Sequence, residues 1–92
     1  MIVSFKDKAT ARFFDGQDVT RFRVFAEQAT RRLQILDDAT TLGDLAGLQS
    51  NRLEALQGDR KGQYSIRVNR QWRICFEFLD GEARNVEIVD YH

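Results

Sequence analysis

The chain has 92 residues, of which 42% are hydrophobic and 30% are charged, so its composition predicts one folded domain over residues 1–92. Its 14 Lys and Arg balance 14 Asp and Glu, which weighs against a general nucleic-acid-binding protein because such proteins are usually basic. The single cysteine excludes an internal disulfide, and the absence of a long apolar run or secretory signal predicts a cytoplasmic protein with no membrane partner.

The first half of the sequence predicts a short strand followed by helices. Residues 2–5 (IVSF) have the apolar and β-branched character of a strand, and residues 7–14 (DKATARFF) fit two helical turns that end near Gly16. A longer helix follows, for which Asp18 is the expected N-cap. Its apolar face repeats at spacings of three and four residues and consists of Phe22, Phe25, Ala29, Leu33 and Leu36. Residues 40–48 (TTLGDLAGL) predict a further short helix.

The second half changes to the two-residue alternation of β-strands. Residues 62–68, 72–79 and 84–91 each alternate apolar and polar side chains, and Asp80-Gly81 is typical of a tight hairpin turn. We therefore expect an antiparallel meander with one apolar face, on which the N-terminal helices pack, and residues 2–5 at one edge of the sheet. The predicted fold class is α+β.

The polar face of this sheet carries the first candidate site. If Val68 and Trp72 face each other across the intervening turn, Arg67 lies opposite Arg73. Two neighbouring guanidinium groups suit a phosphate, although a solvated sheet face with interleaved Arg and Glu explains the same pattern. Trp72, by the same alternation, belongs to the core.

The end of the chain adds two further candidates to this face. Tyr91 has the same strand parity, and His92, the only histidine, follows it directly. Arginine, tyrosine and histidine are the side chains with which metal-free RNA cleavage stabilises the phosphorane and moves protons. One cysteine and one histidine cannot complete a zinc site, so neither a metal nor another cofactor is expected.

The turns beside the sheet supply further basic residues. Residues 57–62 (QGDRKG) predict an exposed turn with Arg60 and Lys61 at its tip, and Arg70 lies in the next connection. These side chains are candidates for contacts with an RNA backbone, but they fit an ordinary polar surface loop equally well. Cys75 is read as structural.

One block of the sequence resembles a known family. The pattern LxGDRxGxxSIRVNxxWRICF at residues 56–76, together with the ending EIVDYH, closely resembles the HigB killer-protein family of the RelE/ParE superfamily, with a particular likeness to its GraT-type branch. The resemblance covers essentially the whole chain. It implies a compact α+β fold like that of microbial ribonucleases.

The resemblance also implies a function and partners. It implies the toxin of a type II toxin–antitoxin system, which cleaves mRNA in the ribosomal A site. The implied partner is a helix-turn-helix HigA antitoxin, through which alone the toxin would reach operator DNA. By the same resemblance Arg73 corresponds to the transition-state stabiliser, and Tyr91 and His92 to acid–base and positioning residues. Presentation of the message by the ribosome would explain the neutral charge.

The sequence departs from the family pattern at two positions. Well-studied HigB toxins have a histidine and a lysine where this chain has Glu54 and Gln57. Glu54 is a candidate base in place of the histidine, and the enzyme is then expected to be weak. The alternatives are a non-catalytic toxin on the same scaffold, either a gyrase poison of ParE type or a ribosome-assembly inhibitor, and an inactive relative that mainly binds the antitoxin.

Overall fold

The structure, a computed structural model, describes residues 1–90, so the predictions for Tyr91 and His92 lie outside the described residues. Its helical segments are α1 (Lys8–Phe14), η1 (Thr20–Phe25, a 3₁₀ helix), α2 (Ala26–Asp38), α3 (Leu42–Ala46) and the short 3₁₀ helices η2 (Gln49–Asn51) and η3 (Gly58–Arg60). Its strands are β1 (Glu54–Ala55), β2 (Tyr64–Arg67), β3 (Trp72–Leu79) and β4 (Glu82–Asp90). They form one antiparallel sheet in the order β1-β2-β3-β4, which confirms the α+β prediction.

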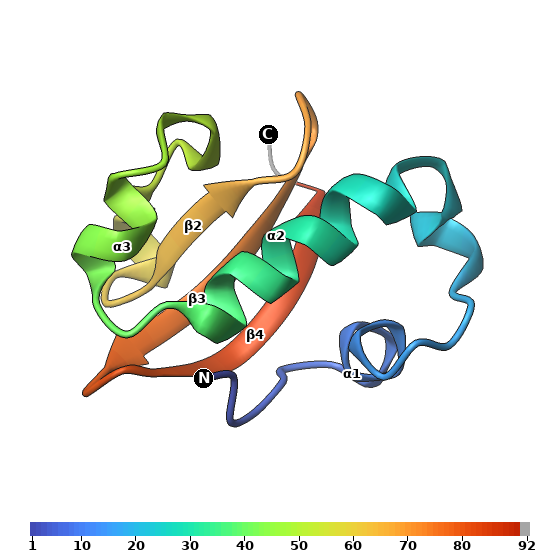
Figure 1. Cartoon of the computed structure of the whole chain (residues 1–92), viewed down its shortest axis with the longest axis horizontal. Coiled ribbons are helices and arrows are strands. Elements are labelled where there is room, and N and C mark those ends of the chain that lie inside the picture. The colour runs from blue at the N-terminus through green and yellow to red at the C-terminus, as the bar shows by residue number, and fades with distance from the viewer. Residues whose placement is uncertain (91–92) are drawn as a thin grey trace.

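Helices α2 and α3 cover one face of this sheet (Figure 1). The predicted apolar face is confirmed, since Phe22, Phe25, Ala29, Leu33 and Leu36 are all buried in the core. The first part of this segment is a 3₁₀ helix, however, and the α-helix begins only at Ala26. The N-cap prediction was wrong: Val19 precedes η1 without a side-chain cap, and the carboxylate of Asp18 binds the guanidinium of Arg23 instead. No helix within residues 1–90 has the length and apolar character needed to cross a bilayer.

The N-terminal segment covers the outer edge of β4. Residues 2–5 do not form a regular strand, but Ile2 and Phe5 make isolated parallel bridges to Ala83 and Val86. Further along the edge, the backbone N–H of Ile88 donates to Thr10 Oγ1 in α1 at 3.1 Å. An exposed edge strand can pair with another chain, and these contacts cover the edge of β4 against such pairing.

A β-bulge in β4 decides which side chains reach each face. Arg84 pairs with Glu77 and Glu87 pairs with Cys75, so two residues of β4 lie opposite the single Phe76 of β3. One of them, Asn85, has a left-handed backbone with φ of 52°. The extra residue allows Ala83 and Val86, three positions apart, to point into the same core, where both are fully buried. Val86 and Ile88 then face the helices as predicted, and Glu87 faces away.

The two hairpins of the sheet follow their turn chemistry. Asp80 and Gly81 both have positive φ, 52° and 78°, as a two-residue type I′ hairpin turn requires. In the turn between β2 and β3, Asn69 Oδ1 accepts hydrogen bonds from the backbone N–H groups of Gln71 and Trp72, at 2.9 and 2.8 Å. Trp72 then packs against the rings of Phe22 and Phe25, which confirms its place at the core.

The left-handed residue at the bulge gives a test of this arrangement. A β-branched side chain at Asn85 clashes with its own backbone at φ of 52°, whereas glycine adopts this conformation without strain. We expect Asn85→Val to lower the free energy of unfolding by about 1–2 kcal/mol relative to Asn85→Gly, measured by urea denaturation. Equal stability of the two variants would show that the bulge does not constrain this position.

Candidate active site on the open face of the sheet

The face of the sheet opposite α2, called here the open face, carries two rows of side chains. The first row crosses all four strands in register, through Glu54, Ser65, Cys75 and Glu87. The second row contains Arg67, Arg73 and Val89. The pairing of Arg67 with Arg73 confirms the register predicted from the sequence.

Arg73, the second residue of β3, lies on this face next to the turn between β2 and β3 and is held there by specific acceptors. Its Nε donates to Ser65 Oγ at 2.7 Å, and its Nη2 donates to the backbone carbonyl oxygen of Arg52, also at 2.7 Å. The same Nη2 lies 4.0 Å from Glu54 Oε1. Only 11% of the Arg73 side chain is exposed, so this guanidinium is much less free to move than a typical surface arginine.

The charge repulsion between the paired arginines is relieved by backbone acceptors. Arg67 turns its Nε to the carbonyl oxygen of Asn69 at 3.0 Å, in the turn between β2 and β3. Arg73 turns toward β1 and binds the carbonyl of Arg52. The sheet therefore keeps two positive charges at adjacent positions, each with its guanidinium turned to a different backbone carbonyl oxygen.

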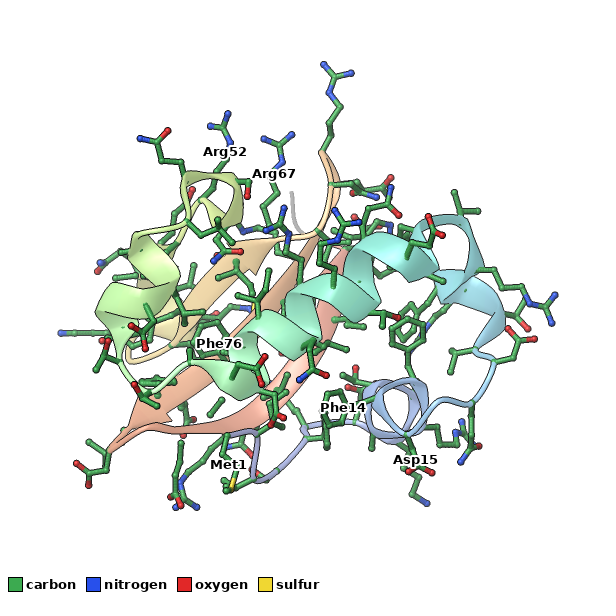
Figure 2. The ribbon with its side chains drawn as sticks, in the orientation of Figure 1. Met1, Phe14, Asp15, Arg52, Arg67 and Phe76 are labelled. Carbon is green, nitrogen blue, oxygen red and sulfur yellow. The ribbon has the colours of Figure 1, made fainter. Side chains whose placement is uncertain are left out.

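Arg52 is the first functional candidate that the sequence did not indicate. It has a left-handed backbone with φ of 45° and ψ of 54°, and its side chain is exposed. Figure 2 shows that the side chains of Arg52 and Arg67 project from the same edge of the molecule. No turn motif marks position 52, because the conformation results from the transition between η2 and β1.

A half-buried charge cluster occupies the part of the open face next to β4. Glu87, 13% exposed, accepts a hydrogen bond from Arg60 Nη1 at 2.7 Å and lies 3.5 Å from Lys6 Nζ. Arg60 also binds Gln63 Oε1 at 3.1 Å. Arg60 is thus folded over the open face rather than extended from the tip of a loop.

Cys75 lies beneath this cluster and is fully buried. Burial raises the pKa of its thiol above the ordinary value. The nearby positive charge of Arg60 opposes this rise in pKa, and the negative charge of Glu87 adds to it. A neutral, buried thiol is a structural group, as the sequence reading supposed.

The other predicted site residues are less closely gathered. Glu54 is on the open face with its side chain 57% exposed, within 4.0 Å of Arg73. Lys61 follows η3 and Arg70 lies in the turn between β2 and β3, both exposed to solvent. Strand β4 is paired as far as Asp90, opposite Trp72, and Gln71 Nε2 donates to Asp90 Oδ2 at 2.9 Å.

Ser65 and Lys6 were also missed by sequence reasoning. The strand parity of Ser65 places it on the open face, but nothing in the sequence distinguishes it from a solvent-facing serine. Lys6 reaches the site only because residues 1–6 follow the edge of β4. Both contacts join segments far apart in the chain, which a local pattern does not reveal.

The chemistry available on the described part of the open face is that of an anion site. Arg73 presents a positioned, permanently charged fork, with Arg67 and Arg52 at the same edge of the sheet, and Glu54 adds an exposed carboxylate beside it. Within residues 1–90, no group of three or more His, Cys, Asp or Glu side chains is placed to hold a metal ion.

Comparison with known proteins places this sequence among bacterial toxins. Residues 3–92 match the family described as RelE-like toxins of the type II toxin–antitoxin system HigB. The chain is 39% identical to endoribonuclease HigB of Proteus vulgaris, over the full length of both proteins. It is 40% identical to toxin HigB-1 of Vibrio cholerae, with 92% of each chain covered.

Solved structures give the same fold at lower sequence identity. The structure resembles a chain of the YoeB–YefM complex from Staphylococcus aureus with a TM-score of 0.63 and 18% identity. The match covers all of this chain and 95% of the other. At this identity the likeness shows a shared fold.

The burial of Cys75 gives a test of whether the charge cluster of Glu87, Arg60 and Lys6 covers it in solution. Because the thiol is buried and its pKa is raised, the thiolate that reacts with disulfide reagents is scarce at pH 8. We expect Cys75 in the native protein to react with Ellman's reagent at least about 100-fold more slowly than in urea-unfolded protein. A native rate close to the unfolded rate would show that the cluster is open in solution.

The carboxylate of Glu87 is expected to hold two cations together. In Glu87→Gln the half-buried Arg60 loses its charged partner, so we expect the free energy of unfolding to fall by about 1–2 kcal/mol at low salt. The matched control is Glu82→Gln, which removes an exposed carboxylate that pairs with Arg84. We expect an effect below about 0.5 kcal/mol there. Similar losses in the two variants would contradict a special role for Glu87.

Proposed function

We propose that this chain, which belongs to the HigB family of RelE-like toxins of type II toxin–antitoxin systems, is an endoribonuclease that cleaves mRNA on the ribosome. The family and the name of the relative from Proteus vulgaris support endoribonuclease activity. The single structural observation that carries the proposal is the guanidinium of Arg73, which specific hydrogen bonds hold on the open face.

The reaction proposed for this site is attack of a ribose 2′-hydroxyl on the adjacent phosphate. The phosphorane formed in this attack is more negative than the ground state, and a preorganised guanidinium stabilises it more than it stabilises the substrate. We assign that role to Arg73. Because Arg73 forms its contacts within the folded chain, little reorganisation is required when the charge develops.

Proton transfer is assigned to groups at both ends of the site. Glu54 is the proposed base for the 2′-hydroxyl, since its carboxylate lies on the open face near Arg73. His92 is the proposed acid for the leaving 5′-oxygen, with Tyr91 as a positioning residue. These assignments agree with the pairing of β4 as far as Asp90, next to the position of Arg73.

Binding of the RNA backbone is assigned to the basic residues around the site. Arg67, Arg70 and Lys61 are exposed or half-exposed beside the open face and are the proposed phosphate contacts. Arg60 is the fourth, although its guanidinium is shared with Glu87. Because the whole chain has no net charge, we propose that the ribosome supplies the message and that the toxin does not bind RNA tightly alone.

An antitoxin is the proposed protein partner. The family belongs to toxin–antitoxin systems, and the related fold of YoeB occurs in a complex with YefM. A HigA-like helix-turn-helix protein is the specific partner proposed here. Contact with operator DNA would then occur only through that partner.

Substitution of Arg73 tests the proposed chemistry. We expect Arg73→Ala to lower the rate of mRNA cleavage in a reconstituted translation mixture by about 10²- to 10³-fold, because one transition-state stabiliser is lost. The matched control is Arg31→Ala, which removes an exposed arginine from α2 on the other side of the domain. Affinity for the antitoxin, measured by calorimetry, confirms that each variant is folded.

Brief induction of this protein in cells distinguishes the proposed endoribonuclease from a non-catalytic toxin on the same scaffold. Codon-phased cuts in primer extension, lost in Arg73→Ala, support the endoribonuclease. Growth arrest with intact mRNA contradicts it, and double-strand DNA breaks in that case would identify a gyrase poison, whereas accumulation of ribosome precursors would identify an assembly inhibitor.

A further inference from the structure

The guanidinium of Arg73 donates two short hydrogen bonds to uncharged acceptors whose role the sequence pattern does not indicate. Ser65 Oγ accepts from Nε, and the carbonyl oxygen of Arg52 accepts from Nη2, both at 2.7 Å. The two acceptors come from different strands or connections, Ser65 from β2 and Arg52 from the residue after η2. A planar fork that is bound at two of its nitrogens from separate segments has a defined position and plane.

We propose that Ser65 is a positioning residue for Arg73, and that the left-handed backbone of Arg52 directs its carbonyl oxygen to the same guanidinium. The inference rests on the proposed function only in that Arg73 is taken to bind the scissile phosphate. Neither Ser65 nor the Arg52 carbonyl contacts the RNA in this proposal, and both act through the guanidinium.

The burial of Ser65 supports this role. Its residue is fully buried, in the row that also contains Cys75 and Glu54. A buried hydroxyl in the middle of a sheet requires a hydrogen-bond partner, and Arg73 is the partner that the structure supplies. Valine or threonine would fit the strand at least as well as serine, so strand propensity does not account for the residue.

The conformation of Arg52 supports the same conclusion independently. A non-glycine residue at φ of 45° is strained, and strained residues persist only where surrounding contacts hold them. Here the conformation places the Arg52 carbonyl within 2.7 Å of Nη2 while the Arg52 side chain stays exposed. The strain is therefore located at one of the two acceptors that orient Arg73.

The position of the fork matters because phosphate recognition by arginine is directional. A guanidinium displaced by about 1 Å still carries its charge but no longer matches the phosphorane oxygens, which lowers kcat more than it raises KM. A purely structural role for Ser65 would instead lower stability and leave the kinetics of the folded fraction unchanged. The two roles are thus separable by experiment.

The first experiment is a double-mutant cycle on single-turnover cleavage of ribosome-bound mRNA. We expect Ser65→Ala to lower the cleavage rate about tenfold at saturating ribosome concentration, with less than a twofold effect on half-saturation. In the Arg73→Ala background the same change should have less than a twofold effect, because there is no guanidinium left to position. Equal effects in both backgrounds would overturn the proposal.

The second experiment compares two variants that both remove the side chain of Arg52. Glycine retains the left-handed backbone without strain, whereas valine disfavours it and displaces the carbonyl. We expect Arg52→Val to cleave five- to tenfold more slowly than Arg52→Gly, with both variants folded by circular dichroism and able to bind the antitoxin. Equal rates would show that the Arg52 carbonyl does not position Arg73.

The cycle also distinguishes failure of this inference from failure of the proposed function. If Arg73→Ala itself leaves cleavage unchanged, Arg73 is not the phosphate-binding group and both proposals fall. If Arg73→Ala abolishes cleavage while Ser65→Ala and Arg52→Val do not slow it, only the positioning role is excluded. Proton exchange at Arg73 Nε, followed by NMR in the Ser65→Ala variant, gives a readout independent of catalysis, and we expect it to accelerate.

Discussion

The pairing of β3 with β4 across the bulge is the constraint on which the open face depends. If Asn85 paired with Phe76 in a regular ladder instead of forming a bulge, Val86 would lie opposite Cys75 on the open face. The charged Glu87 would then face the helices. The bulge instead sends Val86 and Ile88 into the core and presents Glu87 to Arg60 and Lys6. One irregular residue thus satisfies both the hydrophobic core and the polar site.

The open face gathers positive charge in a chain that has none in excess. Its cations are kept apart by partners of different kinds: Arg60 and Lys6 share the carboxylate of Glu87, whereas Arg67 and Arg73 are hydrogen-bonded to backbone carbonyl oxygens. A carbonyl orients a guanidinium without neutralising it. Arg60 and Lys6, which share Glu87, lie over the buried thiol of Cys75 and influence its pKa.

Much of the fold follows from patterns that are local in the sequence. The alternation in residues 62–79 gave the register of Arg67 and Arg73, and the helical spacing gave the buried face that includes Phe22 and Leu33. The two-residue strand β1 and the bulge at Asn85 were not predictable, because each depends on pairing with a distant segment. Ser65 and Arg52 were not predicted for the same reason: their proposed importance lies in their contacts with Arg73, which only the folded chain forms.

The departure at position 54 has a physical interpretation in this arrangement. A histidine there would be neutral for much of the time near pH 7, whereas a carboxylate is charged and attracts the nearby guanidinium of Arg73. In the proposed reaction, that attraction competes with the phosphate for the guanidinium of Arg73. The two uncharged acceptors, Ser65 and the Arg52 carbonyl, bind Nε and Nη2 at 2.7 Å, much closer than the 4.0 Å between Nη2 and Glu54. A carboxylate at position 54 is therefore compatible with the proposed role of Arg73 in binding a phosphate.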